Sequence, residues 1–370
     1  MAITLQSKYG LKRVVNASGR MSILGVSAPT DNVMEAMKQG GQSYVEIAEL
    51  VKRSGEHVAS VMGAEGAVVV NSASSGIALS VAAVVTRGSE RSTLRLHQDS
   101  IVKNEIIMFK GHNVQYGVPV EMMIYLGGGK LVEVGYANEG RADHLEQAIG
   151  ERTAAILFVK SHHCVQKNMI GLEEAQQVAK RHGIPLIVDA AAEEDLYSYV
   201  KLADLVIYSG SKAIEGPTSG IVAGRSPYVD WVRMQLHGIG RSMKVGKEVV
   251  FGLLAALDEY LVKEDKSGQE KQALEQLKVL ADLPGVAVAI VQDEAGRSIF
   301  RGRIRLDSSI AGISAGEVND QLRDGDIAVY TRDYGVRQGY FDLDPRSLQG
   351  DDLAVIIERI QQIVGGTTHV

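Results

Sequence analysis

Two ionisable residues stand at the ends of apolar runs, where an enzyme could use them. Lys212 lies in a turn rich in glycine and serine that follows the run ADLVIYS (203–209), and Asp189 closes the run IPLIVDA (184–190). Lysine is the amine that forms Schiff bases, and burial makes it more nucleophilic by lowering its pKa. Each residue alone also has an ordinary interpretation: Lys212 as a surface-turn lysine, and Asp189 as a helix N-cap or a metal ligand.

A third segment, NSASSG (71–76), lies between the apolar runs AVVV (67–70) and IALSVAAVV (77–85). Small hydroxyl residues and free N–H groups at the start of a helix bind anions, although an ordinary serine N-cap has the same appearance. Together the three features match pyridoxal phosphate (PLP), which needs an amine, a carboxylate near its ring nitrogen and a phosphate site. The stretch from Asp189 to Lys212 has room for one crossover helix, so both residues are expected at the same rim of a sheet.

The elements that must position these residues alternate along the chain. Near-continuous runs of Val, Ile and Leu predict strands that are buried on both faces, as in a mostly parallel sheet covered by helices. A helix is predicted over 172–183, because Gly183 is a typical residue just beyond a helix. The predicted strands are 67–70, 105–109, 130–135, 154–160, 184–190, 203–209 and 220–224.

Beyond about residue 240 the pattern changes to that of an α+β unit. Helices are predicted over 247–265, 275–283 and 353–364, a half-exposed strand over 299–306, and further antiparallel strands over 328–333 and 339–344. We therefore expect three regions: an N-terminal segment (1–50), a large cofactor-binding domain (51–243) and a small C-terminal domain (244–370).

Composition limits the classes of function. The 370 residues are 45% hydrophobic and 23% charged, which is globular, and the net charge of −6 makes a nucleic-acid partner unlikely. The single cysteine, Cys164, excludes an intramolecular disulfide and fits the cytoplasm. We see no secretory signal in MAITLQSKYGLKRVV and no apolar run long enough to span a membrane.

Other motifs are weaker. His112, in KGHNVQYG, is expected to stack on the cofactor ring, with a surface-loop histidine as the alternative. Tyr208 and Lys212 have the Y-x-x-x-K spacing of short-chain dehydrogenases, but Gly210 interrupts the pair and no G-x-G-x-x-G follows the first strand. No metal site is predicted, because H-E-x-x-H and C-x-x-C are both missing from the sequence.

The pattern S-G-x-K-x-x-x-G-P-x-x-G-x-x-x-G, from Ser209 to Gly224, resembles the lysine motif of the bacterial selenocysteine synthase (seryl-tRNA selenium transferase) family. The segment VVNASGRMSILG (14–25) is similar to that family's opening motif, and NSASSG and IPLIVDAAAEEDL match its phosphate loop and aspartate strand. The resemblance implies a fold-type I, aspartate aminotransferase-like PLP enzyme with a mostly parallel seven-stranded sheet and a smaller α+β domain. It also implies a homodimer or a higher homo-oligomer.

The segment GHNVQYGVPVEMMIYLGG and Arg20 look like the branch of this family that acts on small molecules. That branch implies an ammonia-lyase, which eliminates water from a phosphorylated amino sugar acid such as D-glucosaminate 6-phosphate. The products would be ammonia and 2-keto-3-deoxy-6-phosphogluconate. Alternatives remain open: a seryl-tRNA selenium transferase-like enzyme, a PLP-dependent racemase, aldolase or aminotransferase, or a PLP-free binding protein.

The resemblance also assigns roles to single residues. Lys212 would hold PLP and could act as the base, with His112 or His163 as alternative bases, and Asp189 would pair with the ring nitrogen. Thr218 would reach a cofactor across a dimer interface, and Arg20 and Arg337 would bind the substrate, with surface arginines as the alternative. The expected phosphate-binding residues are Ser72, Ala73, Ser74, Ser75 and Ser209.

Overall fold

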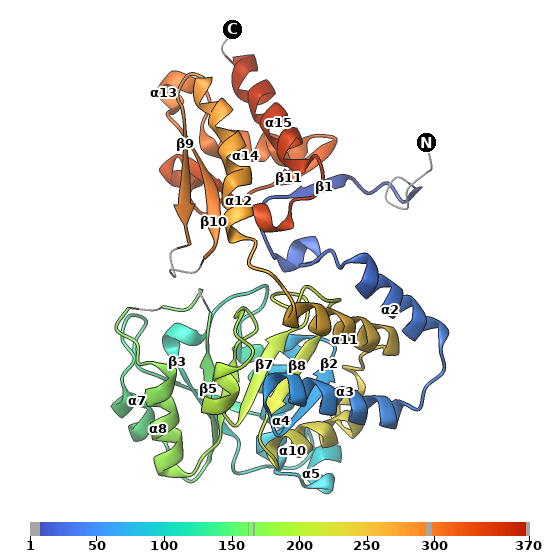
Figure 1. Cartoon of the computed structure of the whole chain (residues 1–370). Coiled ribbons are helices and arrows are strands. Elements are labelled where there is room, and N and C mark those ends of the chain that lie inside the picture. Colours follow the sequence, from blue (N-terminus) through green and yellow to red (C-terminus); the bar gives the residue numbers. More distant parts are fainter. Residues whose placement is uncertain (1–7, 162, 166, 294–297, 368–370) are drawn as a thin grey trace. The chain divides into compact units, whose positions relative to one another are not determined.

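The computed structural model describes residues 8–161, 163–165, 167–293 and 298–367. They form two compact units (Figure 1). Unit 2 is one unbroken stretch, from Ser27 to Val262. Unit 1 joins the two ends of the chain, Met1–Val26 and Lys263–Val370.

Unit 2 is built on a seven-stranded sheet, as the sequence predicts. The central strands are parallel, and β8 runs antiparallel to both of its neighbours, β2 and β7. Asp189 ends β6 and Ser209 ends β7, so the carboxyl ends of two adjacent parallel strands carry the segments of interest. In spatial order the strands are β2 (Gly66–Val70), β8 (Gly220–Gly224), β7 (Leu205–Ser209), β6 (Leu186–Asp189), β5 (Thr153–Val159), β3 (Glu105–Phe109) and β4 (Lys130–Val134).

Helices cover both faces of this sheet, because every central strand is apolar on both sides. One face packs against α4, whose residues Ile77–Thr86 are all buried, and the other packs against α3, α8 and α11. Among the described residues no helix is long and apolar enough to span a membrane. The helices are α2 (Asp31–Gln42), α3 (Ile47–Met62), α4 (Ala73–Thr86), α5 (Glu90–Leu94), α6 (Glu121–Leu126), α7 (Ala142–Ala148), α8 (Leu172–His182), α9 (Ser198–Leu202), α10 (Tyr228–Met234) and α11 (Lys247–Leu261).

Unit 1 has its own core, formed by helices that pack on one face of a three-stranded antiparallel sheet. This sheet has the order β12 (Tyr340–Leu343), β10 (Phe300–Leu306) and β9 (Val286–Gln292). A second, two-stranded sheet pairs β1 (Arg13–Asn16) with β11 (Ile327–Tyr330). The helices are α12 (Ser267–Leu274), α13 (Ser308–Ala311), α14 (Ala315–Asp324) and α15 (Asp352–Thr367), and a 3-10 segment, η5, covers Glu275–Asp282.

Three predictions for the second half of the chain differ from the structure. The strand predicted over 328–333 is not antiparallel: β11 pairs in parallel with β1, a four-residue strand that sequence analysis missed. The helix predicted over 275–283 is the 3-10 segment η5. The helix predicted to reach residue 265 stops at Leu261, because the polar residues KEDK that follow Val262 offer no apolar face to bury.

The unit boundaries also differ from the expected domain boundaries, which were 50/51 and 243/244. Helix α11 belongs to unit 2, where it packs on α2 and α3. Helix α2 belongs there for the same reason, since Val33 is part of the core on that face of the sheet. Residues 8–26 belong to unit 1, where Val15 and Ala17 are fully buried.

The core of unit 1 gives a stability prediction. Phe341 is fully buried between the helices and the three-stranded sheet, so Phe341→Ala should cost about 3–5 kcal/mol of unfolding free energy. Urea unfolding followed by circular dichroism measures this loss. Tyr334→Ala is the control, since Tyr334 is exposed and its truncation should change stability by less than about 0.5 kcal/mol. Equal losses in the two variants would contradict the assigned core.

Candidate functional site

Lys212 and Asp189 lie at the same rim of the sheet in unit 2. Lys212 follows β7 in a tight loop, in which the Gly210 N–H donates to Ser219 O and the Gly216 N–H donates to Gly210 O. Asp189 ends the adjacent strand, and its Oδ1 accepts a hydrogen bond from the Ala191 N–H at 3.0 Å. The two side chains are close enough for each charge to affect the pKa of the other.

Burial is the main cause of the pKa shifts of both Lys212 and Asp189. Burial lowers the pKa of Lys212, and the nearby Asp189 carboxylate opposes that shift only in part. Burial also raises the pKa of Asp189, against the opposing effects of the Ala191 N–H and the Lys212 charge. No described residue forms a hydrogen bond or ion pair with the Lys212 amine. The rim thus holds a nucleophilic amine and a carboxyl whose ionised form needs a cation.

The segment 71–76 forms the start of α4 and lies against the same strands. Ser72 is the N-cap: its Oγ accepts from the Ser75 N–H at 3.1 Å, and Ser75 Oγ donates to Asn71 Oδ1 at 2.5 Å. Gly220 on β8 must be glycine, because a Cβ there would lie 2.5 Å from the Ser72 carbonyl oxygen. This close approach brings the N-terminus of a 14-residue helix to the rim, where its free N–H groups favour an anion.

The other predicted phosphate ligands are distributed around this helix start. Ala73 is the first residue of α4, and Ser74 follows it with its hydroxyl held by a tyrosine described below. Ser209 is buried at the end of β7, 3.2 Å from Ser211 as measured between the two hydroxyl oxygens. Thr218 is exposed in the loop between β7 and β8. The arrangement suits the phosphate, amine and ring-nitrogen contacts that PLP requires.

Tyr116 is a site residue that sequence analysis missed. Its hydroxyl donates to Ser74 Oγ at 3.1 Å, and its pKa is raised by burial and also by the Asp189 carboxylate. An aromatic side chain therefore lies near both the helix start and Asp189. The signal in the sequence is its position in HNVQYG, shortly after a buried strand. In the same segment the sequence analysis selects His112 as the residue that stacks on the cofactor ring.

The two predicted histidines lie in different surroundings. His112 is buried edge-on against the rings of Phe109 and Phe158, and its Nδ1 accepts from the Val159 N–H at 3.4 Å. Burial, and secondarily the charge of Lys160, lowers the pKa of His112 to about 4. His163 is exposed, and its N–H donates to Ser161 Oγ at 3.2 Å. The part of the chain that the structure describes contains no group of three His, Cys, Asp or Glu residues able to hold a metal.

The predicted substrate arginines both belong to unit 1. Arg20 is half-buried. Burial raises the pKa of Glu270, and the charge of Arg20 is one of those that oppose this shift. Arg337 is exposed in the 3-10 turn η6 (Val336–Gln338). Sequence analysis overlooked Arg332, five residues earlier, whose guanidinium is mostly buried and donates to Ser18 O at 3.3 Å. Arg20 and Arg332 lie near the same group of charged residues, since Asp344 acts on the pKa of both Glu270 and Arg332 and Arg20 acts on that of Glu270.

The low pKa of His112 predicts a pH-dependent stability. The unfolded chain takes up this proton near pH 6.5 and the native state only near pH 4, so His112 destabilises the fold as the pH falls through this window. The full effect is roughly 3 kcal/mol. We expect His112→Gln to lose that much less stability than wild type between pH 7 and pH 4 in urea unfolding.

His97 is exposed, so His97→Gln is the matched control and should keep the wild-type pH dependence. A His112→Gln protein with the same pH dependence as wild type would show that the imidazole is not held neutral by burial.

Comparisons with known proteins agree with this geometry. A family model described as L-seryl-tRNA selenium transferase matches residues 14–297. The chain is 45% identical to D-glucosaminate-6-phosphate ammonia lyase from Salmonella typhimurium over 98% of each protein. It is 37% identical to 5'-C-glycyluridine monooxygenase-decarboxylase from a Streptomyces species, over 96% of this chain and 90% of that protein.

Comparison with solved structures places the chain among the same enzymes. A structure of D-glucosaminate-6-phosphate ammonia-lyase matches with a TM-score of 0.94 at 44% identity and covers 100% of both chains. Aspartate aminotransferase from Thermus thermophilus matches at a TM-score of 0.54 and 15% identity, covering 96% of this chain and 93% of that one, which shows the shared fold. The fold is that of the fold-type I enzymes, whose cofactor is PLP. The chain belongs to the L-seryl-tRNA selenium transferase family.

Proposed function

We propose that this protein is a PLP-dependent ammonia-lyase that acts on D-glucosaminate 6-phosphate. The net reaction removes ammonia and gives 2-keto-3-deoxy-6-phosphogluconate; the water lost in the elimination is regained when ammonia is released. The observation that carries the proposal is the Lys212–Asp189 pair at one rim, in a chain 45% identical to an ammonia lyase over nearly its whole length.

The residues of unit 2 fit the cofactor. Lys212 would bind it covalently, and the enclosed Asp189 would hold a proton on the ring nitrogen, which supplies the cation that this carboxylate otherwise lacks. Its phosphate would lie at the start of α4, with Ser72, Ala73, Ser74, Ser75 and Ser209 around it, and Tyr116 would cover its ring. When bound, PLP withdraws electrons from the substrate carbon that carries the amine.

Lys212 is also the best candidate for the base that moves the α-proton. Burial lowers the pKa of this amine, which favours its neutral form, and the neutral amine can accept a proton. His112 is neutral as well, but its ring packs between two phenylalanines and its Nδ1 already accepts a hydrogen bond. His163 is exposed to solvent, unlike the enclosed amine of Lys212.

The same proposal includes the oligomeric state of the enzyme, its compartment and the type of substrate. Thr218, exposed beside the lysine loop, would contact the cofactor of a second copy in a homodimer or higher homo-oligomer. The one cysteine, Cys164, is buried, and burial raises the pKa of its thiol to about 12, which fits an unreactive residue in the reducing cytoplasm. A small molecule is favoured over tRNA, because the L-seryl-tRNA(Sec) selenium transferase of Carboxydothermus hydrogenoformans is only 27% identical over 66% of this chain.

The test is the reaction itself, with two variants. Wild type with PLP and D-glucosaminate 6-phosphate should release ammonia and a keto acid in equal amounts, without a keto-acid acceptor. Lys212→Ala should lose at least about 10³-fold in rate, because the residue that binds the cofactor and moves the proton is gone. Lys180→Ala, on the exposed face of α8, should retain the wild-type rate.

Borohydride reduction followed by peptide mass spectrometry gives an independent result. The cofactor should become fixed to Lys212 in wild type and to no lysine in Lys212→Ala. Release of ammonia only with oxygen consumption would favour chemistry like that named for the Streptomyces relative, and a need for a keto-acid acceptor would favour an aminotransferase. A protein that takes up no PLP would overturn the mechanism.

A further inference from the structure

A second lysine lies at the rim of the sheet in unit 2, and the proposed reaction does not yet use it. Lys160 directly follows β5, and its backbone N–H donates to Asp189 O at 2.8 Å. Lys212 follows β7, and β6 lies between β5 and β7 in the sheet. The two lysines therefore flank the strand that ends in Asp189, within one compact unit.

The geometry of β5 places the Lys160 side chain near His112. Successive side chains of a strand point to opposite faces, so Lys160 continues the face that carries Phe158. The His112 ring packs on that face, with its centroid 4.5 Å from the centroid of the Phe158 ring. In agreement, the charge of Lys160 helps to lower the pKa of His112, and it also acts on the pKa of Cys164.

The Lys160 amine has no acceptor, although the side chain is half-buried. No described residue forms a hydrogen bond or an ion pair with this amine. Burial lowers the pKa of His112 to about 4 and raises that of the Cys164 thiol to about 12, so both neighbours are uncharged near neutral pH. The lysine charge that acts on the Asp189 carboxylate is that of Lys212. One positive charge at the rim is thus left without a counterion.

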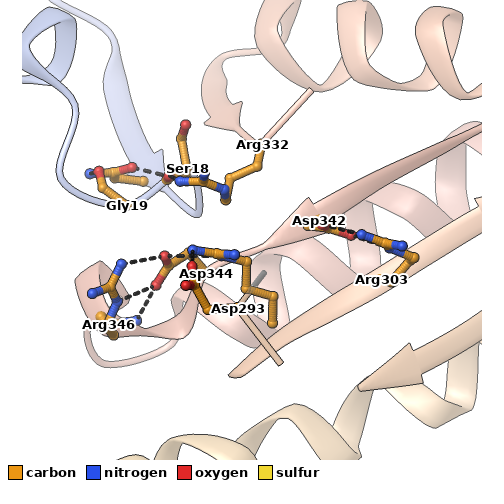
Figure 2. A network of polar contacts seen from close by, with 10 residues as sticks. Ser18, Gly19, Asp293, Arg303, Arg332, Asp342, Asp344 and Arg346 are labelled. Atoms are coloured by element: carbon orange, nitrogen blue, oxygen red, sulfur yellow. Dashed lines mark hydrogen bonds and ion pairs between the residues drawn. The ribbon is translucent and has the colours of Figure 1, made fainter. Parts of the chain in front are cut away.

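Other enclosed cations of this chain show the contrast, because they have acceptors. Lys247, also half-buried in unit 2, donates to two backbone carbonyls in the last turn of α2, at 2.5 and 2.6 Å. In unit 1, Arg303 binds the two oxygens of Asp342 at 2.8 and 2.9 Å (Figure 2). Pairing of this kind is what a charge withdrawn from water needs. The free amine of Lys160 therefore points to an acceptor that comes from a ligand.

A position after a strand is not enough to indicate a site. Lys110 directly follows β3, the neighbour of β5 in the sheet, but its side chain is exposed to solvent. Water can solvate that amine on most sides, so Lys110 needs no other partner. What distinguishes Lys160 is the combination of enclosure, a free amine and contact with the backbone of Asp189.

The proposed class of substrate supplies an anion at this place. In a 2-amino acid the carboxylate is attached to the same carbon as the amine, and that amine replaces Lys212 on the cofactor. The carboxylate must therefore lie close to the rim, whatever the rest of the substrate contacts. A lysine amine is a compact point charge on a flexible stem, which suits a carboxylate that approaches along the rim.

We propose that the Lys160 amine binds the substrate carboxylate that is attached to the reacting carbon, at the rim of unit 2. The inference rests on the proposed function only in that the substrate is a 2-amino acid. Lys160 contacts the ligand and takes no part in the proton transfer, which stays with Lys212. His112 and Cys164 leave the ion pair without a competing charge.

Two ligands that differ at this one group test the site. 6-Phospho-D-gluconate has the carboxylate, and D-glucitol 6-phosphate has a CH2OH group in its place; calorimetry measures the binding of each to the holoenzyme. Lys160→Gln should weaken 6-phospho-D-gluconate roughly 10- to 100-fold, the value of a lost charged hydrogen bond, and should leave D-glucitol 6-phosphate within about 2-fold. Lys160→Arg should weaken the acid less, because it retains the charge.

Lys110→Gln is the matched control and should bind both ligands as wild type does, because Lys110 is exposed. An equal loss of both ligands in Lys160→Gln, or no loss of either, overturns the proposal. A selective loss of the acid in Arg20→Gln, with none in Lys160→Gln, overturns it as well. Circular dichroism and the cofactor absorption of each variant show that it is folded and loaded before binding is measured.

A pair of small amines separates this proposal from the proposed function. D-alanine and D-alaninol differ at the same group but lack the sugar chain and the phosphate, and their binding is followed through the visible absorption of the cofactor. Wild type should prefer D-alanine, and Lys160→Gln should lose at least about 10-fold of that preference. This result supports the site even if D-glucosaminate 6-phosphate releases no ammonia. An unchanged preference overturns the site even if ammonia is released.

Steady-state kinetics distinguish a binding role from a role in proton transfer. A group that holds the carboxylate equally before and during the reaction contributes uniform binding, so Lys160→Gln should raise KM and leave kcat within a few-fold. A large fall in kcat with unchanged KM and unchanged ligand binding would make Lys160 a proton-transfer residue and would overturn the assigned role.

Discussion

Removal of charge from water is the constraint on which the candidate site depends. Lys212 and Asp189 are both enclosed at the carboxyl ends of neighbouring strands. Burial lowers the pKa of Lys212 and raises that of Asp189, and both shifts favour the neutral form of the side chain. Neither effect would persist if the rim were open to solvent, since water would restore the ordinary values. The close packing at this rim depends on glycine, because without Gly220 strand β8 could not lie against the start of α4. The chemistry therefore rests on a packing detail of the backbone.

Much of unit 2 could be predicted from sequence because its signals are local. Each strand is a short run of Val, Ile and Leu, and the end of such a run places Asp189 and Lys212 without any knowledge of distant contacts. Tyr116 could not be found in this way, because its role depends on a hydrogen bond to Ser74, 42 residues earlier. His112 was the more conspicuous residue in the same segment, but its apolar neighbours Phe109 and Phe158 enclose it.

Unit 1 was harder to predict because its contacts join distant parts of the chain. The strand β1 is only four residues long and has no strong pattern of its own, and its partner β11 lies more than 300 residues later. Once that pairing is known, the turn Asn16–Gly19 and the segment after β11, which carries Arg332, come together as neighbours. Sequence analysis selected Arg337 and overlooked Arg332, because the 3-10 turn between β11 and β12 decides which of the two is exposed.

The pairing of β1 with β11 also affects the order in which the two units can fold while the protein is being synthesised. Unit 2 comes from one continuous stretch and can fold as soon as that stretch has left the ribosome. Val14 and Val15 are made before unit 2 and must wait for Ala328 and Val329, which are made after it. Throughout this interval the apolar first strand is unpaired, a state in which strand edges favour aggregation. A slow ribosome or a premature stop would thus leave unit 2 folded while strand β1, which precedes it in the chain, is still unpaired.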